Sequence, residues 1–324
     1  MLFKKLGLLF LSLLICSTGM AEKLTEEQQA AKTKGINLYN QYKDGDPYLR
    51  VAAEAGDREA QYYLAESLRL DNRYMTEEAY KWYVAAAKQG DYYAMFRLAD
   101  TKDDLCSFIN SCPGNIKDYR DWVRLLWKTA EPLAEGGDAE AMLIMYNTTG
   151  DVEWIEKSAG AGYPDAQYYL AAMYEEGKGF FFPPWRRAEK IEELYRKSAE
   201  GGFPKGMMMY AGLLIEKGDL QAAREWTKKG AETGFETMLY NYGSYLAHEP
   251  DKIGYELDLV RGYGIISLLL ELDGGGGTLY LTEEKLKKIA AKMTPEQIEE
   301  AKAFAQEWKA THPPLSFFPD KLGF

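Results

Sequence analysis

The sequence predicts an all-α protein, a right-handed α-solenoid (superhelix) of about six to seven helix-turn-helix repeats with helical caps. Three observations lead to this prediction. A small-residue motif built on one glycine recurs along the chain, bulky side chains stand at fixed distances from that glycine, and helix-start signals occur near both ends. The chain has 324 residues, of which 46% are apolar, so it can bury a substantial core.

The recurring motif is Ala-x-x-Gly-x-x-x-Ala, present in four close copies and two looser ones. Its glycines are Gly56, Gly90, Gly137, Gly162, Gly202 and Gly234. Their spacing centres on the length of one helix-turn-helix unit. Glycine readily adopts the left-handed backbone that ends a helix, and small neighbours let two antiparallel helices approach closely. Each copy therefore predicts one helical hairpin.

Bulky side chains stand eight residues before and eight residues after the glycine in most copies. Examples are Trp82, Trp154 and Trp226 before it, and Leu64, Leu98 and Leu170 after it. These positions lie one helical face away from the small residues. We expect them to form the packed seam of each hairpin.

The fullest copy runs from Gly162 to Gly202. It contains Ala166-Gln167-Tyr168-Tyr169-Leu170, Tyr174, Gly177, Gly179, Ala188, Leu194-Tyr195 and Ala199. In this order and spacing the chain resembles the Sel-one-like repeat (SLR) family, a relative of the tetratricopeptide repeats, over about residues 47–275. The resemblance implies a protein-binding solenoid, with Phe180 buried between the helices of its unit.

Residues 1–21 are typical of a secretory signal peptide. A basic start at Lys4 and Lys5 precedes a short apolar run and a small-residue site for cleavage after Ala21. Lipid attachment at Cys16 is the alternative, which the bulky Ile15 before it disfavours. We therefore expect a periplasmic protein. No later segment has the roughly 20 apolar residues that a transmembrane helix needs.

The remaining chain divides into three parts. We expect an N-terminal capping helix over residues 22–46, the repeat solenoid over 47–275, and a C-terminal helical cap with an aromatic tail over 276–324. Thr25, Thr282 and Thr294 are the expected N-caps of the capping helices. Prolines exclude a helix after residue 312, so the tail aromatics either fold back onto the cap, which we favour, or contact a partner.

The mature chain would keep two cysteines, Cys106 and Cys112, with five residues between them in a local insertion. In an oxidising compartment they can form a disulfide. No histidine lies near them, so we expect no metal site there.

The charge of the chain is acidic. Removing residues 1–21 takes away two of the 39 basic side chains and none of the 50 acidic ones, which leaves a net charge of −13. Nucleic acid and anionic lipid are unsuited to such a surface. Two interpretations remain: the charge attracts a basic protein partner, or it only maintains solubility.

The sequence contains no recognisable catalytic motif. Only two histidines are present, His248 and His312, and neither lies in a motif that would make it a general base. Ser244 lacks the second glycine of a nucleophile elbow. We therefore predict that the chain is not an enzyme and that it needs no cofactor or metal ion.

Two columns of the repeat are expected to line the concave side of the solenoid. Tyr63, Arg97 and Tyr169 stand seven residues after their glycines, and Glu59, Glu140 and Asp165 stand three residues after theirs. Tyrosines beside carboxylates suit a basic protein segment, because aromatic rings supply contact energy and charges set orientation. The alternative is that Tyr63 and Tyr169 only fill space between repeats.

These expectations converge on a periplasmic protein-binding protein, monomeric or in a 1:1 complex. Exported SLR proteins include immunity proteins that neutralise type VI secreted toxins, notably phospholipase effectors, and the resemblance implies such a basic toxin or effector as partner. Other exported members of the family are envelope scaffolds or host-interaction factors. A hydrolase or β-lactam binder is less favoured, because no catalytic serine motif is present.

Overall fold

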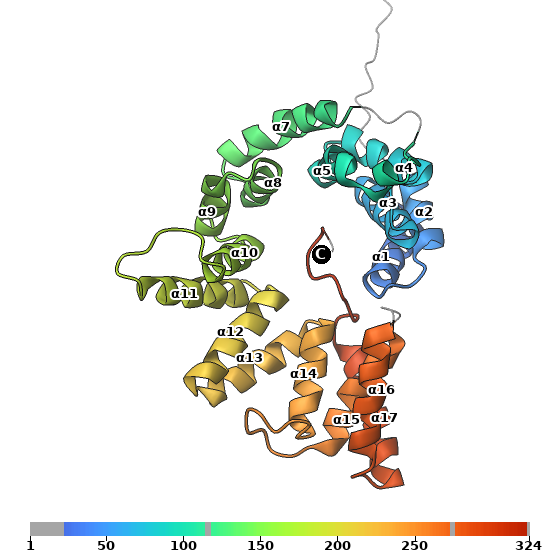
Figure 1. Ribbon diagram of the computed structural model, residues 1–324. Coiled ribbons are helices and arrows are strands. Elements are labelled where there is room, and N and C mark those ends of the chain that lie inside the picture. The colour runs from blue at the N-terminus through green and yellow to red at the C-terminus, as the bar shows by residue number, and fades with distance from the viewer. Residues whose placement is uncertain (1–22, 114–117, 273–275, 323–324) are drawn as a thin grey trace, which may run out of the picture.

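The computed structural model describes residues 23–113, 118–272 and 276–322 of the chain. The predicted signal peptide and Cys16 lie outside these ranges. Within them the chain is built of α-helices joined by short connections, and the one extended pairing is an isolated bridge between Phe235 and Ser316. Figure 1 shows the helices following one another around a curved body, with the C-terminal segment at its centre. The prediction of an all-α repeat solenoid is confirmed.

The helices have the following bounds. The first half contains α1 (Glu26–Asn40), α2 (Asp46–Glu54), α3 (Arg58–Asn72), α4 (Glu77–Lys88), α5 (Tyr92–Ala99), the 3-10 helix η1 (Asp100–Asp103), α6 (Leu105–Phe108), α7 (Tyr119–Glu135), α8 (Ala139–Thr149) and α9 (Val152–Gly160). The second half contains α10 (Pro164–Glu175), α11 (Arg186–Glu200), α12 (Pro204–Lys217), α13 (Leu220–Glu232), α14 (Glu236–Leu246), α15 (Leu259–Leu268), the 3-10 helix η2 (Leu269–Glu271), α16 (Gly276–Ala290) and α17 (Pro295–Thr311).

The motif glycines end the helices as predicted. All six have a positive φ, between 82° at Gly234 and 100° at Gly137. The next residue begins the following helix. Asp57, Asp91 and Asp138 each accept a hydrogen bond there from the backbone N–H three residues later. At Tyr163 and Phe203, which have no capping side chain, a proline at the first helical position supplies the start instead.

The predicted seam forms the core. Leu64, Leu98 and Leu170 are buried, and so is Trp82. Trp154 and Trp226 are only half-buried, because they lie on the outward side of α9 and α13 beneath lysine side chains. The large indole thus covers the seam while a lysine ammonium shields its outer face.

Two of the three expected helix caps are present. Thr25 and Thr294 each form a capping box with a glutamine three residues later. Thr282 is not a cap, and this expectation was wrong. It lies inside α16, because the apolar residues before it are already helical. Its side chain is fully buried. A Thr-Glu-Glu sequence therefore fits a helix interior as well as a helix start.

The insertion after α5 contains η1 and α6. Cys106 and Cys112 are bonded in the structure, with their Cα atoms 4.7 Å apart. Whether the pair is oxidised in the cell stays a prediction. In the ranges the structure covers, no helix has both the length and the apolar composition for crossing a bilayer.

The C-terminal segment, residues 313–322, is here called the tail. It leaves α17 and crosses the centre of the curved body (Figure 1). Ser316 N donates to Gly234 O over 2.9 Å, and Glu236 N donates to Ser316 O over 3.0 Å. Phe317 N donates to Asn40 O over 2.9 Å. The tail therefore folds back as expected, but it contacts α1 at one end of the solenoid as well as α14 near the other.

Candidate protein-binding groove

The inner wall of the solenoid consists of the helices that follow the motif glycines. The last described residues of the tail, Asp320 to Leu322, lie against α3, α5, α10 and α12. We call this surface, with the tail residues it holds, the tail groove. Each wall helix begins directly after a tight glycine turn, so the repeat fixes which side chains face the tail.

One subsite of the groove holds the carboxylate of Asp320. Tyr169 Oη donates to Asp320 Oδ2 over 3.1 Å, and Lys205 Nζ lies 2.7 Å from the same oxygen. The Asp320 side chain is 7% exposed. A buried carboxylate needs such donors, because removing its hydration is costly unless charge and hydrogen bonds replace the water.

The next subsite holds the ammonium group of Lys321. Its Nζ lies 4.4 Å from the ring centre of Tyr93 and 5.2 Å from that of Tyr62. The Asp91 Oδ2 atom is 3.7 Å away. Asp91 also caps α5, so the helix start fixes its carboxylate in place. Two ring faces and one buried carboxylate form a cation site.

The groove also binds the main chain of the tail. Tyr62 Oη donates to the carbonyl oxygen of Lys321 over 2.8 Å, and Arg97 donates to that of Leu322. Arg97 is itself fixed by Glu66, with Nε 2.7 Å from Oε1 and Nη2 3.1 Å from Oε2. Burial opposes ionisation of Glu66, but Arg97 and Arg69 outweigh it and lower its pKa. The guanidinium is therefore held ready before any segment binds.

A cavity of about 370 Å³ lies beside the tail in the same groove. Its wall includes Phe96, Leu143, Ile144, Tyr146, Tyr163 and Met173. Asp165 also lines it, and burial, reinforced by the nearby charges of Asp320 and Glu140, raises the pKa of Asp165 to about 7. The cavity is thus mostly apolar, with one carboxyl group that titrates near neutral pH.

The structure brings several of the predicted site residues together. Arg97 and Tyr169 contact the tail, and Asp165 lines the adjoining cavity. Glu140 accepts hydrogen bonds from Tyr92, over 2.7 Å, and from Tyr93. It therefore orients a ring of the Lys321 subsite without contacting the tail in any described bond.

Tyr63 packs between repeats. Its ring centre is 5.5 Å from those of Tyr39 and Tyr62, both in edge-to-face contact. Tyr39 in turn stacks on Phe318 of the tail at 5.3 Å. Tyr63 thus matches the space-filling interpretation and supports the groove from behind. Whether any of the six predicted residues binds a partner stays a prediction.

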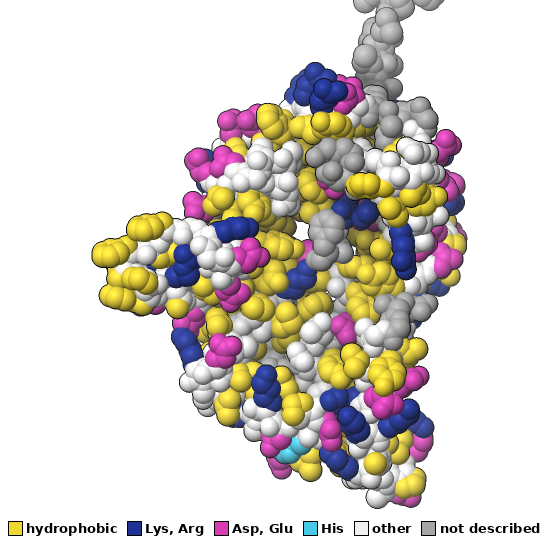
Figure 2. Space-filling view, in the orientation of Figure 1, with side chains coloured by type: hydrophobic (Ala, Val, Ile, Leu, Met, Phe, Trp, Pro, Cys, Tyr) yellow, Lys and Arg dark blue, Asp and Glu magenta, His cyan; other side chains and the backbone are white. Residues whose placement is uncertain are grey.

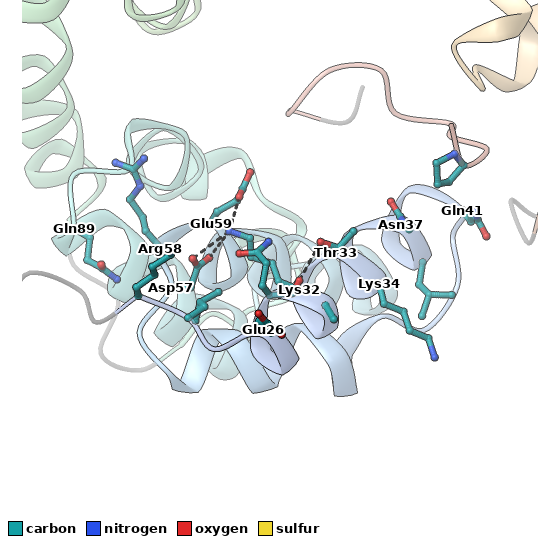
Figure 3. A pocket seen from close by; sticks show the side chains of 16 residues that line it. Glu26, Lys32, Thr33, Lys34, Asn37, Gln41, Asp57, Arg58, Glu59 and Gln89 are labelled. Carbon is teal, nitrogen blue, oxygen red and sulfur yellow. Dashed lines mark hydrogen bonds and ion pairs between the residues drawn. The ribbon is translucent and has the colours of Figure 1, made fainter. Parts of the chain in front are cut away.

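Glu59 lies in a different depression, a shallow trough of about 1260 Å³ between α1 and the start of α3. Figure 3 shows Lys32 reaching from α1 toward Glu59 and Asp57. The Lys32 Nζ atom is 2.8 Å from Glu59 Oε2 and 3.1 Å from Asp57 Oδ2. Glu59 therefore joins α3 to α1, and no described bond links it to the tail.

Two groove residues were absent from the predicted columns: Tyr62 and Asp91. Tyr93 and Lys205, which also line the groove, stand three residues after their glycines and so belong to the second predicted column. Asp91 follows a motif glycine, and its role as an N-cap is visible in the sequence, but nothing local signals its second role opposite Lys321. Tyr62 falls one position before the predicted column. It stands six residues after Gly56, so a column that included this position would have contained it.

The loop between α10 and α11 corrects another expectation. Phe180 is not buried between helices, since it is 90% exposed, and Phe182 and Trp185 are exposed too. Phe181 takes the inward place, with its ring 4.9 Å from that of Tyr174. In Figure 2 the loop projects from the body as a tip with a largely hydrophobic surface. Gly177 and Gly179, at the start of the loop, have positive φ values of 89° and 77°.

Both histidines take part in local structure. His312 stacks on Trp308 with the ring centres 3.7 Å apart, and His248 Nε2 lies 2.8 Å from the Tyr255 carbonyl oxygen. Among the described residues, no group of three or more His, Cys, Asp or Glu is arranged to hold a metal ion. The absence of catalysis stays a prediction.

Comparison with known proteins gives structural similarity only. A protective antigen with an SLR fold from uropathogenic Escherichia coli has 20% sequence identity and a TM-score of 0.48, over 89% of this chain and 62% of that one. A Sel1 repeat protein from Oxalobacter formigenes has 20% identity and a TM-score of 0.42, over 87% of this chain and 86% of that one. No family model matches the chain, and no curated protein matches it.

Proposed function

We propose that this chain is a periplasmic protein-binding repeat protein that takes up a non-helical segment of its partner on the inner wall of the solenoid. One observation carries the proposal: the wall holds a non-helical segment of protein, the tail, through side chains from several repeats. Repeat solenoids present such extended concave surfaces. The periplasmic location in this proposal rests on the predicted signal peptide, residues 1–21.

Within this role, the chain is an immunity protein that neutralises a phospholipase-type effector delivered by type VI secretion. Two sequence features support this narrower version: the resemblance to exported SLR proteins and the acidic net charge, which favours a basic partner. Neutralisation requires only tight binding, so it needs no catalytic group on this chain.

The test combines growth and binding. A candidate effector is directed to the periplasm of a susceptible strain, alone or with the full chain, and the mature chain is titrated with the purified effector by calorimetry. Growth rescue that depends on residues 1–21, together with nanomolar binding, is expected. Absence of both binding and rescue with every effector encoded beside this chain would refute the immunity role.

A matched pair of variants tests the groove. Asn147 is exposed on α8 and lines the cavity, so Asn147→Trp fills the cavity without disturbing the core. Glu153→Trp places the same indole on the exposed face of α9. We expect the first to weaken effector binding at least about tenfold and the second to leave it unchanged. Equal binding by both variants would show that the partner uses another surface.

A further inference from the structure

The two side-chain subsites of the tail groove are specific for an acidic residue followed directly by lysine. The first presents an ammonium group and a hydroxyl, from Lys205 and Tyr169, and the second presents the Asp91 carboxylate and two tyrosine rings. Reversing the order of the bound residues would place lysine beside lysine and carboxylate beside carboxylate. Like-charge contacts of this kind exclude wrong partners.

The main-chain contacts in the groove do not depend on sequence. Tyr62 and Arg97 bind the backbone carbonyl oxygens of residues 321 and 322, which lie in a turn, and a peptide of any sequence has such oxygens. They set the register of a bound segment, and the subsites then read its side chains. The Glu66–Arg97 pair lies within the wall, so Arg97 has a partner there besides the tail.

The tail is attached to the body independently of these subsites. Its upstream residues hold it through backbone bonds at Ser316 and Phe317 and through the rings of Phe317 and Phe318 against Tyr42. Asp320 and Lys321 can therefore leave the groove while the tail stays anchored. Asp320 and Lys321 border the mostly apolar cavity. If a segment from a partner took their positions, this cavity could accommodate the side chain that follows its lysine.

We propose that the tail is an internal ligand of the groove, and that a protein partner binds by replacing it with a non-helical segment of its own in which an acidic residue is followed by lysine and then an apolar residue. This inference rests on the proposed protein-binding function and names the segment that the groove recognises. Because a tethered ligand has an effective concentration in the millimolar range, the tail would weaken every competing segment.

The experiment uses a fluorescent peptide with the sequence of residues 313–324 and two forms of the mature chain. One is the unaltered chain, and the other carries Asp320→Ala and Lys321→Ala, which removes both side chains from their subsites in the full-length protein. Fluorescence anisotropy gives the dissociation constants. We expect the peptide to bind the double variant at least about tenfold more tightly than the unaltered chain.

Specificity is tested with a second peptide in which the aspartate and lysine are exchanged. It should bind the double variant at least about tenfold more weakly than the first peptide. Adding Lys205→Ala to the double variant should weaken the first peptide about fivefold, whereas Lys197→Ala on the outer helix α11 should not. Circular dichroism establishes that each variant is folded. Equal binding of both peptides, or no gain in the double variant, overturns the proposal.

The two proposals fail in distinguishable ways. If the peptides behave as expected but no effector binds, the groove is a tail receptor and the proposed function is wrong. If an effector binds the unaltered chain and the double variant with equal affinity, the proposed function stands and displacement of the tail is wrong.

Discussion

The tail groove and the loop between α10 and α11 use similar aromatic side chains to opposite effect. Tyr62 and Tyr93 are buried in the groove, and their hydroxyl groups bond to the tail and to Glu140. Phe180 and Trp185 lie at the tip of the loop with most of their surface exposed. The groove residues belong to the repeat register, which gives each ring fixed neighbours on adjacent helices. The loop residues lie outside that register.

The largest effect should follow from breaking the charge pair behind the groove. Arg97→Leu leaves the carboxylate of Glu66 buried without its bidentate partner, so the free energy of unfolding should fall by about 3–5 kcal/mol. Urea denaturation followed by circular dichroism measures it. Lys157→Ala, in an exposed pair with Glu153 on α9, should change it by less than about 0.5 kcal/mol. Similar losses in both variants would contradict the comparison.

A pair of glycine variants separates the tail from the repeat. Gly162 and Gly234 both have positive φ, 93° and 82°, so alanine at either should cost about 1 kcal/mol. At Gly162 a Cβ would meet no atom within 4 Å, whereas at Gly234 it would collide with the carbonyl oxygen of Pro314. Gly234→Ala should therefore cost about 1–3 kcal/mol more in thermal unfolding. Equal melting temperatures would mean that the tail contributes nothing there.

The raised pKa of Asp165 predicts a pH dependence specific to the groove. Its pKa is about 7 in the folded chain against 3.8 for an ordinary aspartate, so the folded state holds the proton more tightly. The ionised form therefore destabilises the fold progressively as pH rises from about 4 to about 7. Burial is the main cause, and Asp320 and Glu140 oppose ionisation while Lys205 favours it.

Asp165→Asn removes this titration. The variant should gain stability relative to the unaltered chain as pH rises through that window, reaching about 1–2 kcal/mol above pH 7 after allowance for partial exposure. Melting temperatures across pH 4–8 measure the difference, with Glu153→Gln on the outer face as control. A difference that does not change with pH would refute the prediction.

The smallest effects belong to the loop. Phe180→Ser should change stability by less than about 0.5 kcal/mol, because the ring is exposed. Phe181→Ala should cost about 1 kcal/mol, since its ring packs on Tyr174. Thermal melts distinguish the two. An equal or larger loss for Phe180→Ser would show that the tip of the loop packs on the body.

The repeat could be predicted from the sequence, but the binding of the tail in the groove could not. Glycine turns, aspartate caps and the buried leucines depend on neighbours a few residues away, so their spacing reveals them. The contacts of Asp320 and Lys321 join residues more than a hundred positions apart, and a single acidic-basic dipeptide carries no local signal of where it lies. The sequence also did not reveal which phenylalanine of the loop is buried, because Phe180 and Phe181 are adjacent and Phe181 is the one that packs on Tyr174.

The same long-range contacts have a consequence for how the protein is made. Lys321 meets Tyr62 across a sequence separation of 259 residues, so the residues of the wall are synthesised before the residues that cover them. A nascent solenoid can fold repeat by repeat, because each unit rests mainly on its neighbours. Premature termination near the end of translation would therefore yield a body with intact repeats and an uncovered wall.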